Sequence, residues 1–379
     1  MPHRVLRAMT PDLSSIAARI IGTCLGVDDG DAVLIRSGLY ARPLAEALGL
    51  ACTGRGAHPM LSMSSDEYRV ESITASQDAA LERTPPHLLA AVEASDVVIN
   101  VGHYELLLRD PSLLEGISEV RLSALRRAGI PIRDALFAGG KRSALVGYPS
   151  PHQAKVFGMT QEAYEDHFWA ALDLDYDALG RSCRVLRDAL DGTSEVHITN
   201  PDGTDIRVNI TGRPLLMDDG VIDDEDRERG LNMLNLPAGE VCVAPVLKGT
   251  DGTAVFSRVL YKGAEVRDLA LTFADGVLVE WHASAGEDLF RGMLEGATGH
   301  RDRLGELGIG TNPALTRAIG SLHLDEKVRG TIHLALGENR MMGGENESSL
   351  HWDLIMEHPT LEADGRTLIR EGVHRTPSI

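Results

Sequence analysis

The residues that could carry chemistry gather in the last third of the chain, where histidines and carboxylates alternate with apolar side chains. In the run 331–336, three aliphatic residues occupy alternate positions, so a strand there would turn His333 away from its aliphatic face. The same period of two would place His351 and Asp353 side by side, with Trp352 on the opposite face. This spacing is suited to chelating a metal ion.

Five candidate metal ligands offer nitrogen and oxygen donors: Glu240, Glu306, His333, His351 and Asp353. Imidazole nitrogens and carboxylate oxygens hold divalent transition ions at hydrolytic sites, with one position left open for water. Two histidines and three carboxylates suit a pair of ions, because three negative charges nearly balance four positive ones once a hydroxide bridges the ions. The set therefore predicts a two-metal hydrolytic site, in which Glu306 also counts as a catalytic residue.

Length and composition narrow the class of protein. A chain of 379 residues most often makes two domains, and its 43% hydrophobic and 25% charged residues are ordinary for a globular protein. The net charge of -19 argues against nucleic acid or an anionic membrane as the main partner. No run of eighteen apolar residues predicts a membrane span. Four widely spaced cysteines in apolar contexts are expected to be buried free thiols, which suits a cytoplasmic protein: Cys24, Cys52, Cys183 and Cys242.

The first half alternates helical and strand patterns, which is typical of a parallel α/β layer. We expect an open sheet with helices on its faces, built from helices over 12–25, 43–51 and 76–94 and strands over 32–35, 60–63, 96–100 and 144–148. The run 139–143 lacks the first glycine of a phosphate loop, so it is read as a basic loop and not as a nucleotide site. The acidic run 160–191 is expected to form a pair of connecting helices.

The pattern changes near residue 194, after which short strands and turns dominate. Expected elements are strands over 196–199, 206–210, 241–246, 252–261, 266–273 and 277–281, a helix over 287–295 and a closing hairpin around 364–365. The charged run 218–229 is expected to be a mobile loop, either a lid over a site or a plain solvated loop. The predicted fold class is α/β with two domains: an N-terminal open α/β sheet domain over 1–193, and a C-terminal mixed α/β catalytic domain that binds metal over 194–379.

Four blocks resemble the M29 family of metalloaminopeptidases in their order and spacing: Pro237-Ala238-Gly239-Glu240, Leu304-Gly305-Glu306, the run 325–337 and the run 346–353. The N-terminal run 24–35 is similar to that family too, so the resemblance covers nearly the whole chain. It implies a two-domain α/β protein, usually dimeric, with a two-metal site in its C-terminal domain. The family's ligands fall on the five residues named above.

One position departs from the family pattern. The family has a catalytic Tyr seven residues after its first ligand His, where this chain has Arg340. Either Arg340 or Asn346 could replace the tyrosine by stabilising a developing oxyanion, since both donate hydrogen bonds. An arginine does not exchange protons near neutral pH, so Glu338 is the candidate general acid or base.

A sister group with the same architecture performs different chemistry. The 2,5-dihydroxypyridine 5,6-dioxygenases open a pyridine ring with one ferrous ion, and the chain shares with them a short loop before His351 and the segment 309–313. In that group the first iron ligand is a His where this chain has Glu306. His333, His351 and Asp353 would still make the two-His, one-carboxylate set that suits non-haem iron. This alternative stays open.

The leading expectation is a cytoplasmic hydrolase that cleaves an amide or peptide-like bond with a metal-activated water. Its expected cofactors are two divalent ions (Zn, Co or Mn), its substrate is a small molecule or short peptide, and it is expected to be a homodimer without nucleic acid or membrane partners. An Fe(II) ring-opening dioxygenase is the second hypothesis. A relative that only binds a ligand is the third, and the complete ligand set disfavours it, because buried carboxylates are costly without an ion.

Overall fold

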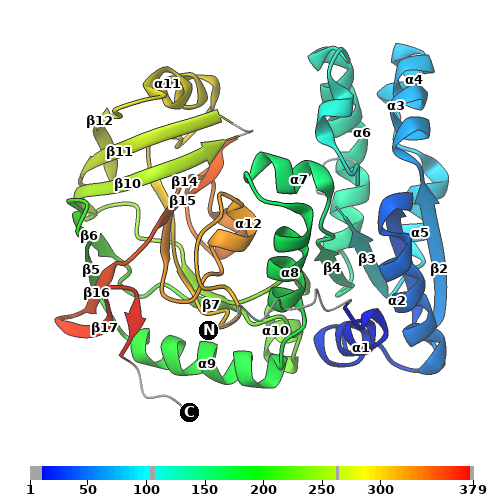
Figure 1. Ribbon diagram of the computed structural model, residues 1–379, viewed down its shortest axis with the longest axis horizontal. Coiled ribbons are helices and arrows are strands. Elements are labelled where there is room, and N and C mark those ends of the chain that lie inside the picture. The colour runs from blue at the N-terminus through cyan, green and yellow to red at the C-terminus, as the bar shows by residue number, and fades with distance from the viewer. Residues whose placement is uncertain (1–10, 103–106, 262–263, 376–379) are drawn as a thin grey trace, which may run out of the picture. The chain divides into compact units, whose positions relative to one another are not determined.

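The computed structural model describes residues 11–102, 107–261 and 264–375. By its contacts the chain divides into two units (Figure 1). Unit 1 comprises Met1–Tyr176 and Gly220–Pro237, and unit 2 comprises Asp177–Asp219 and Ala238–Ile379. The chain thus passes between the units three times, whereas the sequence predicted a single cut after residue 193. That cut stays a prediction about where independently folding domains begin.

Unit 1 contains a five-stranded parallel sheet in the order β2-β1-β3-β4-β8. Its strands are β1 (Ala32–Gly38), β2 (His58–Ser64), β3 (Val97–Val101), β4 (Arg142–Val146) and β8 (Met233–Leu236). The first four are the strands that the sequence predicted, so the predicted open α/β sheet is confirmed. The fifth was missed, because β8 is short and reaches the sheet only after the chain has passed through unit 2.

The helices of unit 1 follow the predicted alternation with one correction. They are α1 (Leu13–Arg19) continued by the π-helix η1 (Ile20–Cys24), α2 (Arg42–Gly54), α3 (Asp66–Ala75), α4 (Asp78–Leu81), α5 (Pro86–Glu93), α6 (Glu119–Phe137), α7 (Pro151–Val156) and α8 (Gln161–Leu172), with short 3-10 turns η2 (Leu39–Ala41) and η3 (Pro111–Leu114). The single helix predicted over 76–94 is wrong. Ser65 caps a helix that begins earlier and ends at Ala75, and Pro86 can begin a new helix but cannot continue one.

A layer of aliphatic residues joins this sheet to two of its helices. Leu34 of β1 and Val98 of β3 pack against Val92 of α5 and Ile132 of α6, and all four are buried. Burial of such side chains stabilises the fold by about 1.5–3 kcal/mol each. This packing accounts for aliphatic residues in the two central strands, β1 and β3.

The charged run predicted as a loop over 218–229 contains a short helix, α10 (Asp224–Arg229). Asp223 and Asp226 form a reciprocal capping box, and Gly230 ends the helix in the left-handed conformation with φ of 74°. A capped acidic first turn therefore accounts for the density of charge in this run.

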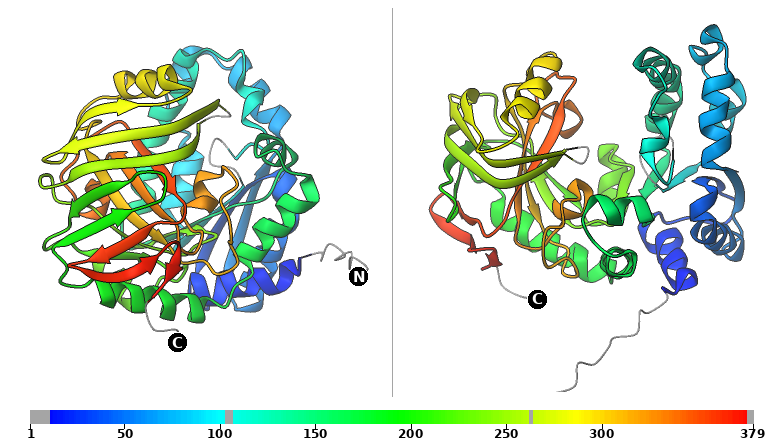
Figure 2. Two further views of the ribbon diagram at one scale, coloured as in Figure 1. Left: turned by 60° about the vertical axis from the view of Figure 1, so that its left-hand side comes forward. Right: turned by 45° about the horizontal axis from the view of Figure 1, so that its top comes forward.

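Unit 2 is built from two antiparallel sheets (Figures 1 and 2). The eight-stranded sheet has the order β12-β11-β10-β6-β5-β16-β17-β18, with bounds β5 (Glu195–Thr199), β6 (Asp205–Asn209), β10 (Asp251–Tyr261), β11 (Ala264–Ala274), β12 (Val277–His282), β16 (Thr360–Ala363), β17 (Arg366–Arg370) and β18 (Val373–His374). The five-stranded sheet has the order β15-β14-β13-β9-β7, with bounds β7 (Leu215–Asp218), β9 (Glu240–Val243), β13 (Leu304–Gly310), β14 (Ile332–Gly337) and β15 (His351–Met356).

The remaining helices are α9 (Tyr176–Leu190), α11 (Glu287–Gly296), α12 (Leu322–Asp325) and the 3-10 turn η4 (Arg340–Met342). The predicted pair of helices within 160–191 is confirmed as α8 and α9. The predicted closing hairpin around 364–365 is confirmed as well, since Asp364 and Gly365 have positive φ between the paired strands β16 and β17. Asp275 and Gly276 form a second such turn between β11 and β12.

Two expectations from composition can also be compared with the structure. All four cysteines are buried thiols outside any disulfide, as predicted. Among the described residues, no helix is long and apolar enough to cross a membrane.

Candidate metal centre

The five-stranded sheet aligns three of the candidate ligands through its register. Residues directly opposite one another in neighbouring strands share a face of the sheet. Asp353 of β15 lies opposite Ala335 of β14, which in turn lies opposite Glu306 of β13. His351 precedes Asp353 by two positions and therefore lies on the same face, as the sequence predicted.

The same face receives the other two candidates from β14 and β9. His333 lies two residues before Ala335 and directly opposite Gly308 of β13, and Gly308 lies opposite Cys242 of β9. Glu240 precedes Cys242 by two positions. All five predicted residues are thus brought to one face of one sheet, from four different strands.

Glu306 occupies the centre of this arrangement. Its Oε1 lies 3.3 Å from Nε2 of His333, and its Oε2 lies 3.2 Å from Nε2 of His351. On one side, Nε2 of His333 is also 3.4 Å from Oε2 of Glu240. On the other side, Nε2 of His351 is 3.4 Å from Oδ1 of Asp353. The two oxygens of one carboxylate therefore each face a separate imidazole.

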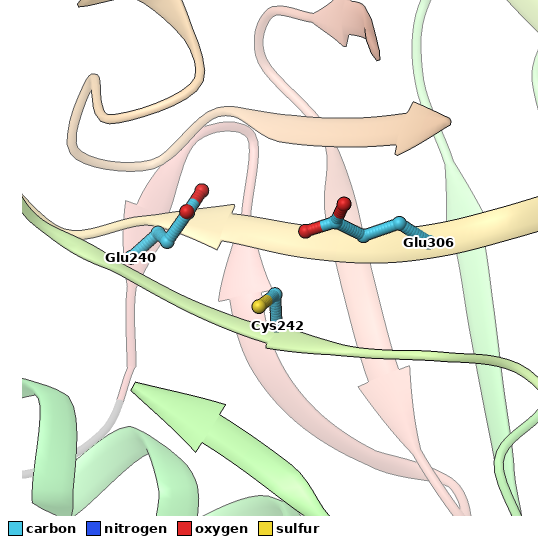
Figure 3. A group of neighbouring side chains, drawn as sticks. All are labelled: Glu240, Cys242 and Glu306. Carbon is cyan, nitrogen blue, oxygen red and sulfur yellow. The ribbon is translucent and has the colours of Figure 1, made fainter. Parts of the chain in front are cut away.

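Two groups of donor atoms are compact enough to hold an ion. Glu306, His351 and Asp353 form one, with one donor atom of each residue within 4.8 Å of the others. Glu240, Cys242 and Glu306 form the other, and their side chains lie on the same side of β9 and β13 (Figure 3). The sequence indicated Cys242 only as a buried thiol. Its position two residues after Glu240 was the signal that could have linked it to this face.

Burial and charge perturb the ionisable groups of this face. Burial alone would lower the pKa of His333, but the hydrogen bond to Glu306 and the charges of Glu240 and Glu306 raise it to about 10. Burial is likewise outweighed at His351, where Asp353 and Glu306 raise the pKa to about 12. Burial favours the neutral form of Glu306, yet hydrogen bonds from both histidines hold its pKa well below its usual value. The carboxylates thus attract cations strongly.

The hydrogen-bonding pattern of these residues fits metal ligation. Oε2 of Glu240, Nδ1 of His333 and Oδ1 of Asp353 are buried and have no hydrogen-bond partner among the residues that the structure describes. Buried polar atoms are costly unless they are paired. Nitrogen and carboxylate oxygen are also the donors that zinc, cobalt, manganese and ferrous ions accept. The residues present therefore suit a divalent ion.

A model of the thermophilic metalloprotease (M29) family matches residues 9–373. The chain belongs to the M29 family. It is 26% identical to aminopeptidase T of Thermus aquaticus over 96% of both chains, and 25% identical to aminopeptidase AmpS of Bacillus subtilis over 68% of this chain and 71% of the relative. Membership confirms the predicted family and makes this protein a metal-dependent peptidase, hence a hydrolase.

Two solved structures share the fold of this M29 protein. Wild-type AmpT from Thermus thermophilus superposes with a TM-score of 0.76 at 21% identity, covering 96% of this chain and 98% of that one. The 2,5-dihydroxypyridine dioxygenase from Pseudomonas putida KT2440 gives a TM-score of 0.62 at 16% identity, covering 99% of this chain and 100% of that one. At these identities the likeness concerns the fold, and it confirms the predicted α/β class.

A buried lysine of this M29 chain escaped the sequence analysis. The side chain of Lys327 is only 1% exposed, and its Nζ lies 2.5 Å from Oε1 of Glu240, 2.9 Å from Oδ2 of Asp218 and 3.1 Å from Oε1 of Glu326. Burial disfavours the charged amine, but the three carboxylates raise its pKa well above the usual value. Lysines are rarely buried, and no local pattern around Asp325-Glu326-Lys327 indicates that this one is.

The remaining candidate residues, Glu338, Arg340 and Asn346, lie in the loop after β14. Glu338 accepts hydrogen bonds from Nε of Arg340 at 2.8 Å and from the backbone N–H of Ser348 at 2.9 Å, and the bonds from Arg340 lower the pKa of Glu338 to about 2. A carboxylate that is ionised down to this pH is a weak proton donor near neutrality. The geometry therefore favours an anchoring role for Glu338. Its backbone carbonyl also accepts from Nδ1 of His351 at 2.8 Å, which directs Nε2 toward the other donors.

Asn346 and Arg340 differ in how firmly the protein holds them. The Asn346 carboxamide is buried and donates to the carbonyl of Leu304 at 3.0 Å, while its backbone N–H donates to Oδ1 of Asn339 at 2.8 Å. The side chain of Arg340 is 54% exposed and pairs with Glu338. Asn346 is therefore engaged in tying its loop to β13, whereas the guanidinium of Arg340 is exposed and pairs with Glu338 and Glu347.

Proposed function

We propose that this M29 protein is an aminopeptidase-type hydrolase that cleaves an amide or peptide-like bond with a water activated by two divalent ions. The observation that supports it is the central position of Glu306, whose two oxygens face two separate histidines. Glu240, Glu306 and His333 would hold one ion, and Glu306, His351 and Asp353 the other. Zinc, cobalt and manganese all suit such donors.

Charge balance supports two ions. Five carboxylates surround the centre, from Asp218, Glu240, Glu306, Glu326 and Asp353, and Lys327 supplies one positive charge. Two divalent ions and one ammonium carry five positive charges, which equals the five carboxylates when the imidazoles are neutral. A single divalent ion would leave a buried excess of negative charge, which is unfavourable in a protein interior.

The two halves of the centre differ in the exposure of their side chains, and we infer different tasks for them. Divalent ions bound there would lower the pKa of a water molecule toward neutrality and polarise a substrate carbonyl. The side chains of His333 and Glu306 are 1% and 7% exposed, whereas that of His351 is 38% exposed. Substrate would therefore approach from the side of His351 and Asp353, while His333 and Glu240 stay shielded from solvent. We propose a small molecule or short peptide as substrate, and a cytoplasmic homodimer remains our prediction.

Arg340 is the proposed stabiliser of developing negative charge on the substrate. Its guanidinium carries several N–H donors and keeps its charge at every relevant pH. Because Glu338 accepts from its Nε and Nη2 and Glu347 lies 3.5 Å from its Nη1, the guanidinium is oriented without being buried. Asn346 is the weaker candidate for this role, since its amide already donates to Leu304.

Replacement of Glu306 tests the two-metal proposal. Glu306→Gln keeps the shape of the side chain but removes the charge shared by the two groups, so metal content should fall and hydrolysis of aminoacyl anilides and short peptides should drop at least about a hundredfold. Glu280→Gln, at an exposed position of β12, is the matched control and should retain both. Full metal content and activity in Glu306→Gln would overturn the assignment.

A dioxygenase remains the second candidate, because one face of the sheet offers two imidazoles and Asp353, a set suited to non-haem iron. Protein loaded anaerobically with one Fe(II) can be mixed with 2,5-dihydroxypyridine in an oxygen electrode. Oxygen consumption with ring opening, in protein that does not cleave peptides, would favour this reading. Absence of oxygen uptake together with zinc-dependent hydrolysis favours the hydrolase. Protein that takes up none of these ions would revive a role in ligand binding alone.

A further inference from the structure

The Glu240 half of the centre contains a cation that belongs to the protein itself. Lys327 is buried, and three carboxylates meet its Nζ at 2.5, 2.9 and 3.1 Å. In the part of the chain that the structure describes, the ion-pair partners of Glu306 and Asp353 are imidazoles and not ammonium or guanidinium groups. The two halves of the centre therefore differ in fixed positive charge.

Lys327 also determines which oxygen Glu240 can offer. The ammonium binds Oε1, while Oε2 lies 3.4 Å from Nε2 of His333 and has no hydrogen-bond partner within the described part of the chain. A carboxylate held in this way presents a single oxygen to an ion. Glu306, in contrast, has each of its oxygens facing a different imidazole.

We propose that Lys327 is a positioning residue that makes the two metal positions unequal. It fixes Glu240 as a one-oxygen ligand, and its charge cancels part of the attraction that Asp218, Glu240 and Glu326 exert on a divalent ion bound beside it. The position formed by Glu306, His351 and Asp353 binds its ion tightly, and the position that includes Glu240 and His333 binds its ion more weakly and exchanges it more readily. This inference rests on the two-metal function proposed above.

Titration of the metal-free protein with Zn²⁺ tests this inference, with calorimetry for the affinities and native mass spectrometry for the number of ions bound. The wild-type chain should take up two ions in two resolved steps. Lys327→Met keeps the length of the side chain but removes its charge, so the weaker step should tighten by roughly tenfold or more. Lys248→Met makes the same change at an exposed position and should leave both steps unaltered.

The thermal stability of the metal-free protein gives an independent measurement. Without the ammonium, three carboxylates lose their partner, so metal-free Lys327→Met should melt below the wild-type chain, and saturating Zn²⁺ should recover more of its melting temperature than it adds to the wild-type chain. Lys327→Arg, which keeps the charge, should preserve the weak step. A weak step that is unchanged or lost in Lys327→Met would overturn the inference.

Asp218→Asn is the alternative variant for the Zn²⁺ titration if Lys327→Met does not fold. Asp218 offsets part of the lysine charge without belonging to either donor group, so its neutralisation should weaken the looser step. An unchanged or tighter step in Asp218→Asn would overturn the role of Lys327. Failure of the wild-type chain to bind Zn²⁺ would instead overturn the two-metal function, and two equal steps that Lys327→Met does not affect would overturn the inference alone.

Discussion

Gly308 lies directly opposite His333 in the β13–β14 pair, and a Cβ atom added to Gly308 would lie 2.1 Å from Nε2 of the imidazole. The missing side chain is therefore what allows the imidazole to lie across β13. Glu306 is two residues away on the same face of that strand. A glycine in the interior of a buried strand thus has a specific reason, which is the close approach of a candidate metal ligand.

Gly308→Ala should displace His333 and reduce metal content. Overlap in a close-packed interior costs typically about 1–3 kcal/mol, so chemical denaturation of the metal-free variant should show a loss of that order. Gly292→Ala is the control, because nothing lies within 4 Å of the added Cβ atom on α11. That change should be neutral or stabilise the helix by up to about 1 kcal/mol. Wild-type stability and metal content in Gly308→Ala would contradict this account of the glycine.

Zinc binding should release protons from the two histidines. In the metal-free protein the pKa of His333 is raised to about 10 and that of His351 to about 12, so both imidazoles hold a proton at pH 7. Only neutral imidazole binds an ion, hence affinity should rise with pH. Calorimetry in buffers of different ionisation enthalpy should report roughly one to two protons released. The exposed His282 is the control, since His282→Gln should not alter the number. Binding without proton release would contradict the raised pKa values.

Replacement of Asn346 should lower the stability of the protein, whereas replacement of Arg340 should lower its turnover. Asn346→Ala leaves the buried carbonyl of Leu304 without its donor, so denaturation should show a loss of about 1–3 kcal/mol. Arg340→Ala removes an exposed, solvent-screened ion pair and should leave the denaturation curve close to that of the wild-type chain. If Arg340 stabilises the oxyanion, its removal should lower kcat about a hundredfold with little change in metal content. An unchanged kcat in Arg340→Ala would exclude that role.

His374 should make unit 2 sensitive to mild acid. Burial, helped by the charge of Arg329, lowers the pKa of His374 to about 4, although the carbonyl of Gly310 partly opposes this. Because the folded pKa is below the ordinary value of 6.5, the unfolded chain binds the proton first. The contribution of neutral His374 is complete above about pH 6.5 and is lost as the pH falls toward 4. Urea denaturation should show that the free energy of unfolding falls less between pH 7 and pH 5 in His374→Gln than in the wild-type chain. Equal losses of unfolding free energy would count against this assignment.

Several features of the fold followed from local patterns. The period of two around His333 and from His351 to Asp353 predicted strands, and β14 and β15 confirm them. Burial alternates along β15, with His351 exposed and Trp352 buried, whereas β14 is buried throughout. The Asp-Gly turn at 364–365 and four parallel strands of unit 1 were also predicted from local patterns. The single helix over 76–94 failed because local helical spacing hid the start at Asp66 and the break before Pro86.

The sequence by itself determined the donor types, their spacing along each strand and the family, because alternation along a strand is a local property of the backbone. Only the tertiary structure decided that Glu240 lies beside His333, since the register between strands distant in sequence is set by packing and backbone hydrogen bonds. It also decided that Lys327 is buried. A lysine enters the interior only where carboxylates from several segments converge on it, and Asp218, Glu240 and Glu326 meet only when the chain has folded.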